Sequence, residues 1–277
     1  TKLNLFWFRR DLRLIDNHGL YEALQSELPV LPIFIFDTNI LDKLENKEDK
    51  RVDFIFQALE KLNEYLEKQG KSIQIFYGKP LEIYENLSQQ YEIGNVFCNE
   101  DYEPYAIKRD QDIKDFLASK NINFYQFKDQ VIFQKDEIVK ADGKPYTVYT
   151  PYSKQWLLKF NDQNIEFFAS EKKLDKLLNI EKQNITLEHI GFKKTNYLFE
   201  PPKINLEILE KYHETRNLPT KETSQVSVHL RFGTISARKL VKLASELNDN
   251  TYLKELIWRE FFMQILWHFP KVIHHSF

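Results

Sequence analysis

Short apolar runs alternate with longer amphipathic segments over the first 127 residues, and this alternation constrains the fold of the chain more than any other feature. The runs predict five buried strands, at residues 3–8, 30–36, 73–77, 96–99 and 124–127. Strands that alternate with helices are connected by right-handed crossovers and form a mostly parallel sheet. Ligands of such sheets bind at the carboxyl ends of the strands.

The segments between these strands are predicted to be helices. Residues 52–69, 80–91 and 104–120 each carry apolar side chains on one face. The first of them has apolar residues at spacings of four, three and four, namely Ile55, Leu59, Leu62 and Leu66. This spacing is typical of an amphipathic helix. The first part of the chain therefore predicts a Rossmann-like α/β domain with a parallel sheet over residues 1–130.

The alternation of strands and helices fades after this domain. Residues 131–203 contain a turn at 141–145 and then a polar, lysine-rich stretch that ends in Pro201 and Pro202. Such a composition is typical of a surface linker. We therefore expect residues 131–203 to form a long connector.

The remainder of the chain has a helical pattern without strands. Helices are predicted at residues 204–216, 236–247 and 251–269. The last of them is apolar over much of its surface and needs partners that three helices do not supply. We therefore expect residues 204–277 to form an incomplete all-α domain.

Composition excludes several classes of protein. The 39 basic and 41 acidic side chains argue against broad, charge-driven coating of nucleic acid, although they leave a local basic groove open. The one cysteine, Cys98, forms no internal disulfide and indicates a reducing cytoplasm, and without clustered histidines no metal site is expected. The seven glycines form no phosphate loop, which argues against kinases, GTPases and NAD-dependent dehydrogenases. No apolar run has the length of a membrane span.

Three arginines surround one aspartate directly after the first strand, at Arg9, Arg10, Asp11 and Arg13. At the carboxyl end of a strand, such a group of side chains has two interpretations. It binds a ligand, or it holds the first loop in place through Arg–Asp ion pairs. Because we expect Asp11 to occupy one guanidinium, we favour an ion-pair network.

Hydroxyl groups cluster ahead of a predicted helical stretch, at Thr223, Ser224 and Ser227. Together with free backbone N–H groups they suit a phosphate, and they equally suit the capping of a helix. The residues leave both interpretations open. For Ser236, at the start of the helix predicted over 236–247, we expect an N-cap.

An acid, an indole and a guanidinium share one face of the last predicted helix, because Glu255, Trp258, Arg259 and Phe262 lie at offsets of three, four and seven. This set suits a flat, hydrogen-bonding ligand such as a nucleobase. The alternative is a core helix with a Glu255–Arg259 ion pair, which the residues alone favour. Upstream, residues 203–242 hold eight Lys/Arg against four Glu, which fits phosphate contacts or a solvated helix face.

Five segments, in the correct order, resemble signatures of the photolyase/cryptochrome family. WFRRDLRLIDN at 7–17 resembles the N-terminal signature, and CNEDYEPYAIKRD at 98–110 resembles an antenna-domain motif. YTPYSKQW at 149–156 resembles the connector motif of the family. TSQVSVHLRFGTIS at 223–236 and ELIWREFF at 255–262 resemble two flavin-domain signatures, and both are long and specific. The resemblance covers essentially the whole chain.

The resemblance implies an α/β antenna domain, a connector and the first helices of an all-α FAD-binding domain. It implies a deoxyribodipyrimidine photo-lyase, a carbon–carbon lyase that flips a pyrimidine dimer out of UV-damaged DNA beside FAD. Blue light then drives an electron from reduced FAD to the dimer, the cyclobutane ring splits and the electron returns. Cyclobutane dimers are expected ahead of (6-4) products, and the protein is expected to be a monomer.

The resemblance also assigns roles to residues by their position in the motifs. Glu255 and Trp258 match the catalytic, lesion-facing pair. FAD contacts are implied for Tyr212, Thr223, Ser224, Gln225, Val226, Ser227, Tyr252 and Arg259. DNA contacts are implied for Arg216, Glu255, Trp258, Arg259, Glu260, Phe261 and Phe262.

An antenna pigment is expected near Glu103, which matches the folate-contacting acid of the 98–110 motif. In folate-binding relatives a lysine forms the second half of the site, and its nearest counterpart here is His274. Folate, deazaflavin, another flavin and the absence of an antenna pigment all stay open. Chains of the family continue beyond the point that matches Phe277, so we expect this chain to bind FAD weakly or not at all, and not to repair DNA.

Two other functions stay open from the sequence. A cryptochrome senses blue light without repair, although Glu255 and Trp258 favour repair because a sensor needs no dimer-facing pair. A nucleotide-binding α/β module without photochemistry does not need the motifs at 223–236 and 255–262.

Overall fold

The computed structural model describes residues 2–275, and its first half contains a five-stranded sheet. The strand order is β3-β2-β1-β4-β5, and every neighbouring pair is parallel, as predicted. From β1 the chain continues to β2 and β3 on one side, and β4 and β5 then follow on the other side of β1. The strand order therefore reverses between β1 and β4, and the crevice at the carboxyl ends of these two strands is the switch point where ligands bind in such sheets. The strands are β1 (Lys2–Phe8), β2 (Val30–Asp37), β3 (Gln74–Gly78), β4 (Glu92–Asn99) and β5 (Asn123–Phe127).

All five predicted strands are confirmed; their ends agree to within one residue, except that β4 begins four residues before its apolar run. β4 begins at Glu92, ahead of the predicted start, because Gly94 and Asn95 interrupt the apolar pattern. The pairing of β1 with β4 shifts register at this point. A Cβ atom on residue 94 would lie 2.6 Å from Leu28 Cδ1 and 3.0 Å from Asn4 Oδ1, so only glycine permits this close approach.

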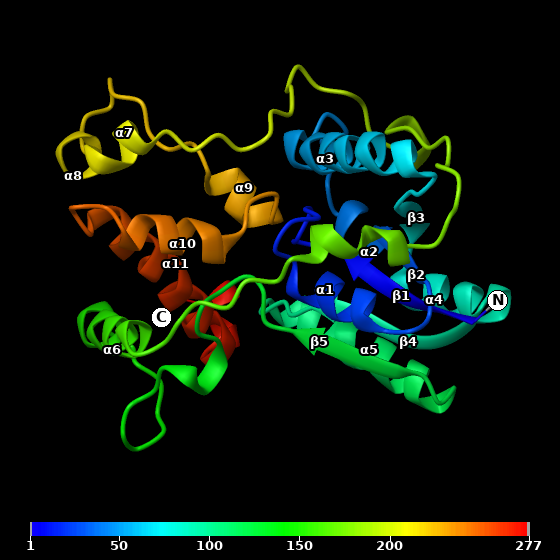
Figure 1. Ribbon diagram of the computed structural model, residues 1–277, viewed down its shortest axis with the longest axis horizontal. Coiled ribbons are helices and arrows are strands. Elements are labelled where there is room, and N and C mark those ends of the chain that lie inside the picture. Colours follow the sequence, from blue (N-terminus) through cyan, green and yellow to red (C-terminus); the bar gives the residue numbers. More distant parts are fainter. Residues whose placement is uncertain (1, 276–277) are drawn as a thin grey trace.

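Helices cover both faces of the sheet (Figure 1). Successive residues of β1 enter two separate apolar cores, as the period of a strand buried on both faces requires. One core packs on α1 (His18–Gln25) and α3 (Lys50–Leu66), the other on α4 (Pro80–Gln90) and α5 (Pro104–Ser119). The short helices α2 (Thr38–Leu41) and η1 (Glu67–Gln69) flank α3.

The second half of the chain forms a group of helices beside the sheet, with its own apolar core (Figure 1). The helices predicted over 236–247 and 251–269 are confirmed as α10 and α11, whereas the stretch predicted over 204–216 divides into α7 and α8. Within residues 2–275, no helix combines the length and the hydropathy that crossing a membrane requires. The helices are α7 (Leu206–Glu210), α8 (Tyr212–Thr215), α9 (Ser227–Phe232), α10 (Ala237–Ser245), α11 (Thr251–His268) and η5 (Pro270–Ile273).

The predicted connector is more packed than a surface linker. Phe133, Tyr152 and Trp156 belong to the helical core, whereas Leu177 and Ile190 belong to a core of the sheet. Apolar residues of the connector, spaced among its lysines, thus reach both parts of the molecule. Its helices are η2 (Lys135–Glu137), α6 (Tyr149–Asn161), η3 (Ser170–Lys176) and η4 (Glu188–Ile190). The domain boundaries after residues 130 and 203 stay a prediction.

Candidate functional site

A buried network of ion pairs joins the sheet to the helical part of the chain. Arg13 Nη2, in the loop after β1, lies 2.8 Å from Asp129 Oδ1, just after β5. Arg238, in the first turn of α10, lies 2.8 Å from the same carboxylate and 3.1 Å from Asp16. Burial opposes the ionisation of Asp129, but Arg13 and Arg238 outweigh it and lower the pKa of Asp129 to about 2. The predicted ion-pair network after the first strand is confirmed.

The predicted partner of these arginines is wrong. Among the described residues Asp11 forms no ion pair; its carboxylate accepts hydrogen bonds from the Arg9 N–H at 2.7 Å and the Asn99 amide at 2.5 Å. Burial and the nearby Asp129 carboxylate raise the pKa of Asp11 to about 6. Arg9 pairs with Asp110 of α5 at 2.6 Å. These partners lie far along the chain, beyond the reach of local spacing.

The same loop fixes the turn between α9 and α10. The Leu12 N–H donates to Phe232 O at 3.1 Å, and Arg13 Nη1 donates to Gly233 O at 3.2 Å. Gly233 has a φ of +67°, and an added Cβ atom would lie 2.1 Å from Arg10 O. Glycine alone permits this approach. The segment that ends in this turn is therefore held against the carboxyl end of the sheet.

The hydroxyl groups ahead of α9 do not cap a helix. α9 begins at Ser227, and its N-cap residue, Val226, forms no side-chain cap. Ser236, in contrast, caps α10 by accepting from the Lys239 N–H at 3.1 Å, as predicted. Gln225 has a φ of +51°, a conformation that non-glycine residues adopt mostly in special turns. The capping alternative for the hydroxyl cluster is therefore wrong.

Residues 223–226 line one side of a cavity of about 590 Å³, and several side chains within residues 197–208 line the other. Ser224 Oγ accepts a hydrogen bond from Tyr252 OH at 3.1 Å. The rings of Tyr252 and Tyr212 meet edge to face, with centroids 5.2 Å apart. The structure thus brings together Tyr212, Ser224 and Tyr252, which come from three separate parts of the sequence.

Glu255, one turn further along α11, pairs with Arg216 across 2.6 Å, and both side chains are about 40% exposed. The expected Glu255–Arg259 pair is wrong. Such an i,i+4 pair is worth only a few tenths of a kcal/mol, whereas Arg259 reaches two backbone carbonyls, Gln130 O at 2.6 Å and Leu230 O at 3.4 Å. Burial lowers the pKa of Arg259 to about 10. Neither Glu255 nor Arg259 lines the 590 Å³ cavity.

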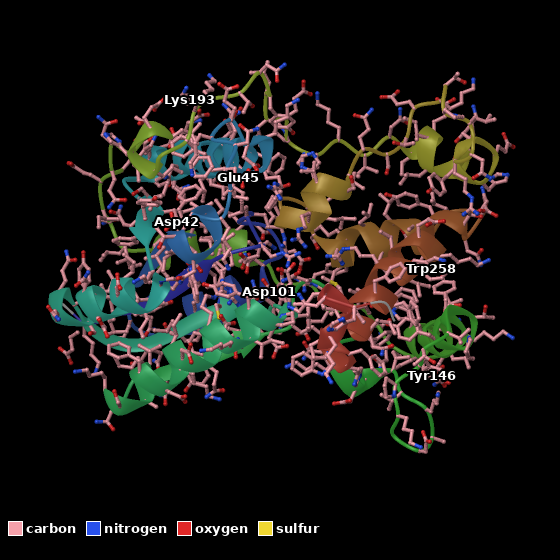
Figure 2. All side chains as sticks on the ribbon, turned by 180° about the vertical axis from the view of Figure 1, so that it is seen from behind. Asp42, Glu45, Asp101, Tyr146, Lys193 and Trp258 are labelled. Atoms are coloured by element: carbon pink, nitrogen blue, oxygen red, sulfur yellow. The ribbon has the colours of Figure 1, made fainter. Side chains whose placement is uncertain are left out.

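Trp258, labelled in Figure 2, belongs to a stack of aromatic rings that joins α11 to α6. Its ring lies parallel to that of Tyr149 on α6, with centroids 3.6 Å and planes 6° apart. Phe262, which is 61% exposed, packs on Trp258 at 5.4 Å. The sequence prediction gave Tyr149 no role, and its one signal was its place at the start of the 149–156 motif.

Glu260 and Phe261 face the interior, where the predicted DNA contacts do not fit. Glu260 is 2% exposed and accepts hydrogen bonds from the Phe133 N–H at 3.2 Å and from Trp156 Nε1 at 2.7 Å. Burial raises the pKa of the Glu260 carboxyl group. Phe261 is 5% exposed. We therefore assign both residues to the core of the helical part.

Glu103 lines a cavity of about 240 Å³ at the carboxyl ends of β1, β2 and β4. Its carboxylate pairs with Arg10 at 3.0 Å and with Arg231 of α9 at 2.9 Å. This places α9 at the border of a cavity that lies at the switch point of the sheet.

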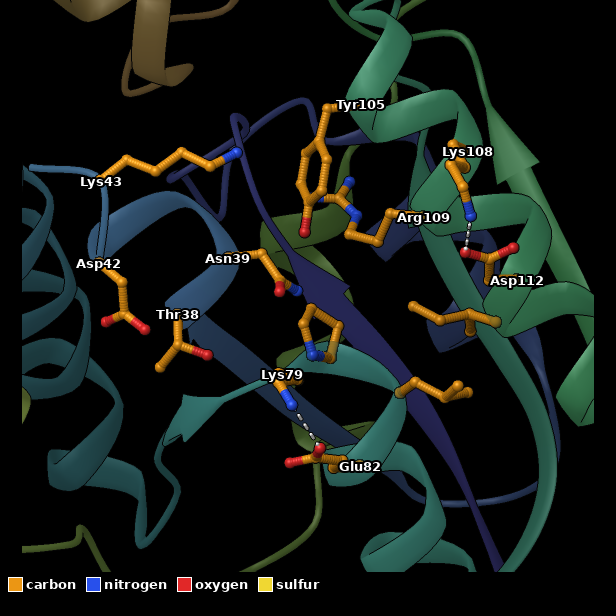
Figure 3. Close-up of a pocket in the computed structure, with 13 residues that line it drawn as sticks. Thr38, Asn39, Asp42, Lys43, Lys79, Glu82, Tyr105, Lys108, Arg109 and Asp112 are labelled. Atoms are coloured by element: carbon orange, nitrogen blue, oxygen red, sulfur yellow. Dashed lines mark hydrogen bonds and ion pairs between the residues drawn. The ribbon is translucent and has the colours of Figure 1, made fainter.

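A wider cavity of about 620 Å³ adjoins the first and shares Tyr105 and Arg109 with it. Figure 3 shows both side chains reaching from α5 toward the opening, with the amine of Lys43 directed at Tyr105. The Arg109 guanidinium also lies over the ring of Trp7, 4.7 Å from its centroid. Aromatic rings and cations together suit a planar, anionic ligand. No cluster of potential metal ligands occurs in the part of the chain that the structure describes.

The model of the DNA photolyase family matches residues 4–171, more than half of the chain. The chain belongs to the DNA photolyase family. It is 28% identical to the deoxyribodipyrimidine photo-lyase of a Synechococcus species, over 97% of this chain and 61% of that relative. The chain thus spans about three fifths of the length of this photolyase.

Solved photolyase structures share the fold of this chain. The class III photolyase of Agrobacterium tumefaciens superposes with a TM-score of 0.82 at 24% identity, over 99% of this chain and 61% of that one. A Sulfolobus tokodaii photolyase, described with two FAD molecules and a novel light-harvesting cofactor, gives 0.75 at 22% identity, over 99% and 61%. Cryptochromes are also among the matching proteins.

Replacing Asp129 by asparagine is expected to destabilise this photolyase-family chain, because the buried Arg13 then loses its counter-charge and Arg238 keeps only Asp16. Breaking a buried pair in this way costs about 3–5 kcal/mol. Urea unfolding measures the effect. Asp142→Asn, in an exposed turn, is the matched control and should leave the free energy of unfolding almost unchanged.

The same substitution is expected to change the response to acid. The pKa of Asp129 falls from 3.8 to about 2 in the folded state, so its stabilising contribution is complete above pH 3.8 and is lost as the pH falls towards 2. The unaltered protein should lose stability in this window, and Asp129→Asn should lose less. Equal pH slopes for the two proteins would contradict the network.

Proposed function

We propose that this chain forms the antenna domain and the first FAD- and DNA-binding helices of a deoxyribodipyrimidine photo-lyase. The reaction is the blue-light-driven splitting of cyclobutane pyrimidine dimers in UV-damaged DNA. One observation carries the proposal: Tyr212, Ser224 and Tyr252 lie together beside the Arg216–Glu255 pair, while the loop hydroxyls cap no helix. Membership of the photolyase family supports the same function.

The loop ahead of α9 fits the phosphate-bearing part of FAD, because it combines hydroxyl groups that cap no helix, a cavity and a left-handed turn. Reduced FAD, when bound, supplies the light-driven electron that opens the cyclobutane ring. Burial raises the pKa of Tyr252, so its phenol keeps its proton and acts as a donor. The proposed FAD contacts are Tyr212, Thr223, Ser224, Gln225, Val226, Ser227 and Tyr252. We assign Arg259 to the positioning of α11, since carbonyl groups engage its guanidinium.

Glu255 and Trp258 are proposed to face the flipped dimer, and Arg216 a DNA phosphate. A carboxylate accepts hydrogen bonds from the N–H groups of a pyrimidine edge, and an indole packs on its ring. In the free protein, Arg216 already forms an ion pair with the Glu255 carboxylate. Lesion binding therefore exchanges partners: Glu255 turns to the base, and Arg216 turns to the backbone of the DNA.

A second, light-harvesting chromophore of the folate or deazaflavin class is proposed for the cavity that contains Glu103. The switch point of a parallel sheet favours ligands, and the nearby Arg10, Tyr105 and Arg109 suit a planar, anionic ring. A monomeric state and a cytoplasmic location complete the proposal; the buried thiol of Cys98 is compatible with a reducing compartment.

A cryptochrome-type light sensor is the second candidate, because cryptochromes are among the matching proteins. The exposed Glu255 carboxylate and the ring stack of Trp258 favour repair, since a sensor has no lesion to contact.

The product of the gene's full reading frame, and not the 277-residue chain by itself, is expected to remove cyclobutane dimers from an oligonucleotide in blue light and not in the dark. Chromatography of the oligonucleotide before and after illumination measures the loss of dimers. Flavin absorbance without repair would favour the sensor. Absence of flavin from the purified protein would contradict both candidates.

Glu255→Gln is expected to strengthen binding to undamaged DNA, because it releases Arg216 for a phosphate. One additional phosphate contact should steepen the slope of log K against log salt by about 0.9. Fluorescence anisotropy at several salt concentrations measures both quantities.

Two further variants separate this exchange of partners from a simple loss of negative charge. Glu210→Gln removes one acidic charge from α7 without releasing Arg216, and should change the salt slope less. Arg216→Gln combined with Glu255→Gln should bind like Arg216→Gln alone. An unchanged salt slope in Glu255→Gln would refute the exchange.

A further inference from the structure

The indole of Trp258 stacks on the ring of Tyr149, a residue to which the family motifs assign no role. Tyr149 opens α6 and stacks on Trp258 of α11, with ring centroids 3.6 Å and planes 6° apart. Two rings so close and so nearly parallel are in van der Waals contact over most of their area. Tyr149 therefore covers one face of the indole.

Tyr149 is itself held at two points. Its hydroxyl group donates to Lys254 O of α11 at 2.9 Å. The ring of Phe261, which is buried, meets both rings edge-on, at 5.9 Å from Tyr149 and 5.6 Å from Trp258. Burial raises the pKa of Tyr149 to about 12, so the hydroxyl keeps the proton that it donates. The pair of rings is thus fixed from the hydroxyl end and from the core.

A ring that is already fixed binds a flat ligand more tightly than a mobile one, because no rotamer freedom is lost on binding. Phe262, packed on Trp258 and 61% exposed, extends the aromatic surface toward solvent. A flipped dimer uses this surface, whereas an intact duplex keeps its bases stacked and contacts the protein through phosphates. Fixing Trp258 should therefore favour damaged DNA alone.

We propose that Tyr149 is a positioning residue that sets the preference for damaged DNA by holding Trp258 in the orientation that receives the lesion. The inference rests on the proposed function, which places Trp258 against the dimer. It assigns to α6, outside the helices that carry the flavin-domain motifs, a part in lesion recognition.

Three variants of the 277-residue chain test this role. Tyr149→Ala removes the ring, Tyr149→Phe keeps the ring and removes the hydroxyl group, and Tyr146→Ala is the matched control. Tyr146 lies in the same segment but packs on Tyr152, at 6.4 Å (Figure 2 labels Tyr146 and Trp258). Fluorescence anisotropy gives the affinity for an oligonucleotide with one cyclobutane dimer and for its undamaged counterpart.

Tyr149→Ala is expected to weaken binding of the damaged oligonucleotide roughly fivefold, as loss of one aromatic pair does, and to leave binding of the undamaged one unchanged. Tyr149→Phe should retain most of the preference. The near-UV circular dichroism of the tryptophans should change in Tyr149→Ala and stay the same in Tyr146→Ala.

The outcomes separate this inference from the function on which it rests. If the unaltered chain shows no preference for the damaged oligonucleotide, the proposed lesion site fails and the role of Tyr149 fails with it. If the preference is present and survives in Tyr149→Ala, or falls equally in Tyr146→Ala, only the role of Tyr149 is overturned.

Discussion

The ion-pair network around Asp129 and Arg238 is the contact on which the arrangement of the two halves depends. Asp16 follows β1, Asp129 follows β5, and Arg238 lies in the first turn of α10, so one guanidinium ties two loops of the sheet to the helical part. Burying each ion costs several kcal/mol in itself. The network therefore stabilises the structure only when every member is present, and this requirement fixes where α10 lies.

From this anchor the chain reaches both candidate ligand sites through one short helix. Arg231, near the end of α9, pairs with Glu103 at the cavity between the strands. Val226, at the start of α9, lines the cavity of the hydroxyl loop. The bond from Tyr252 to Ser224 then ties this loop to α11. A single docked element thus relates the cavity that contains Glu103, the hydroxyl loop and α11 to one another.

Local patterns predicted the elements better than the contacts between them. The strands followed from their apolar runs, and only the start of β4 was hidden, by Gly94 and Asn95. The partner of Arg259 was missed because a spacing of four suggests Glu255, whereas its acceptors are Gln130 O and Leu230 O. The stack of Tyr149 on Trp258 joins two helices distant in sequence, and periodicity within either helix carries no trace of it.

Hydrogen exchange at the amides of residues 223–236 tests the central role of the ion-pair network most directly. In Arg238→Met, the account predicts that these amides exchange roughly tenfold faster or more, because α10, which follows this segment, loses the ion pairs that hold it to the sheet. Exchange in the central strands of the sheet should stay slow. Unchanged protection of residues 223–236 in this variant would contradict the account.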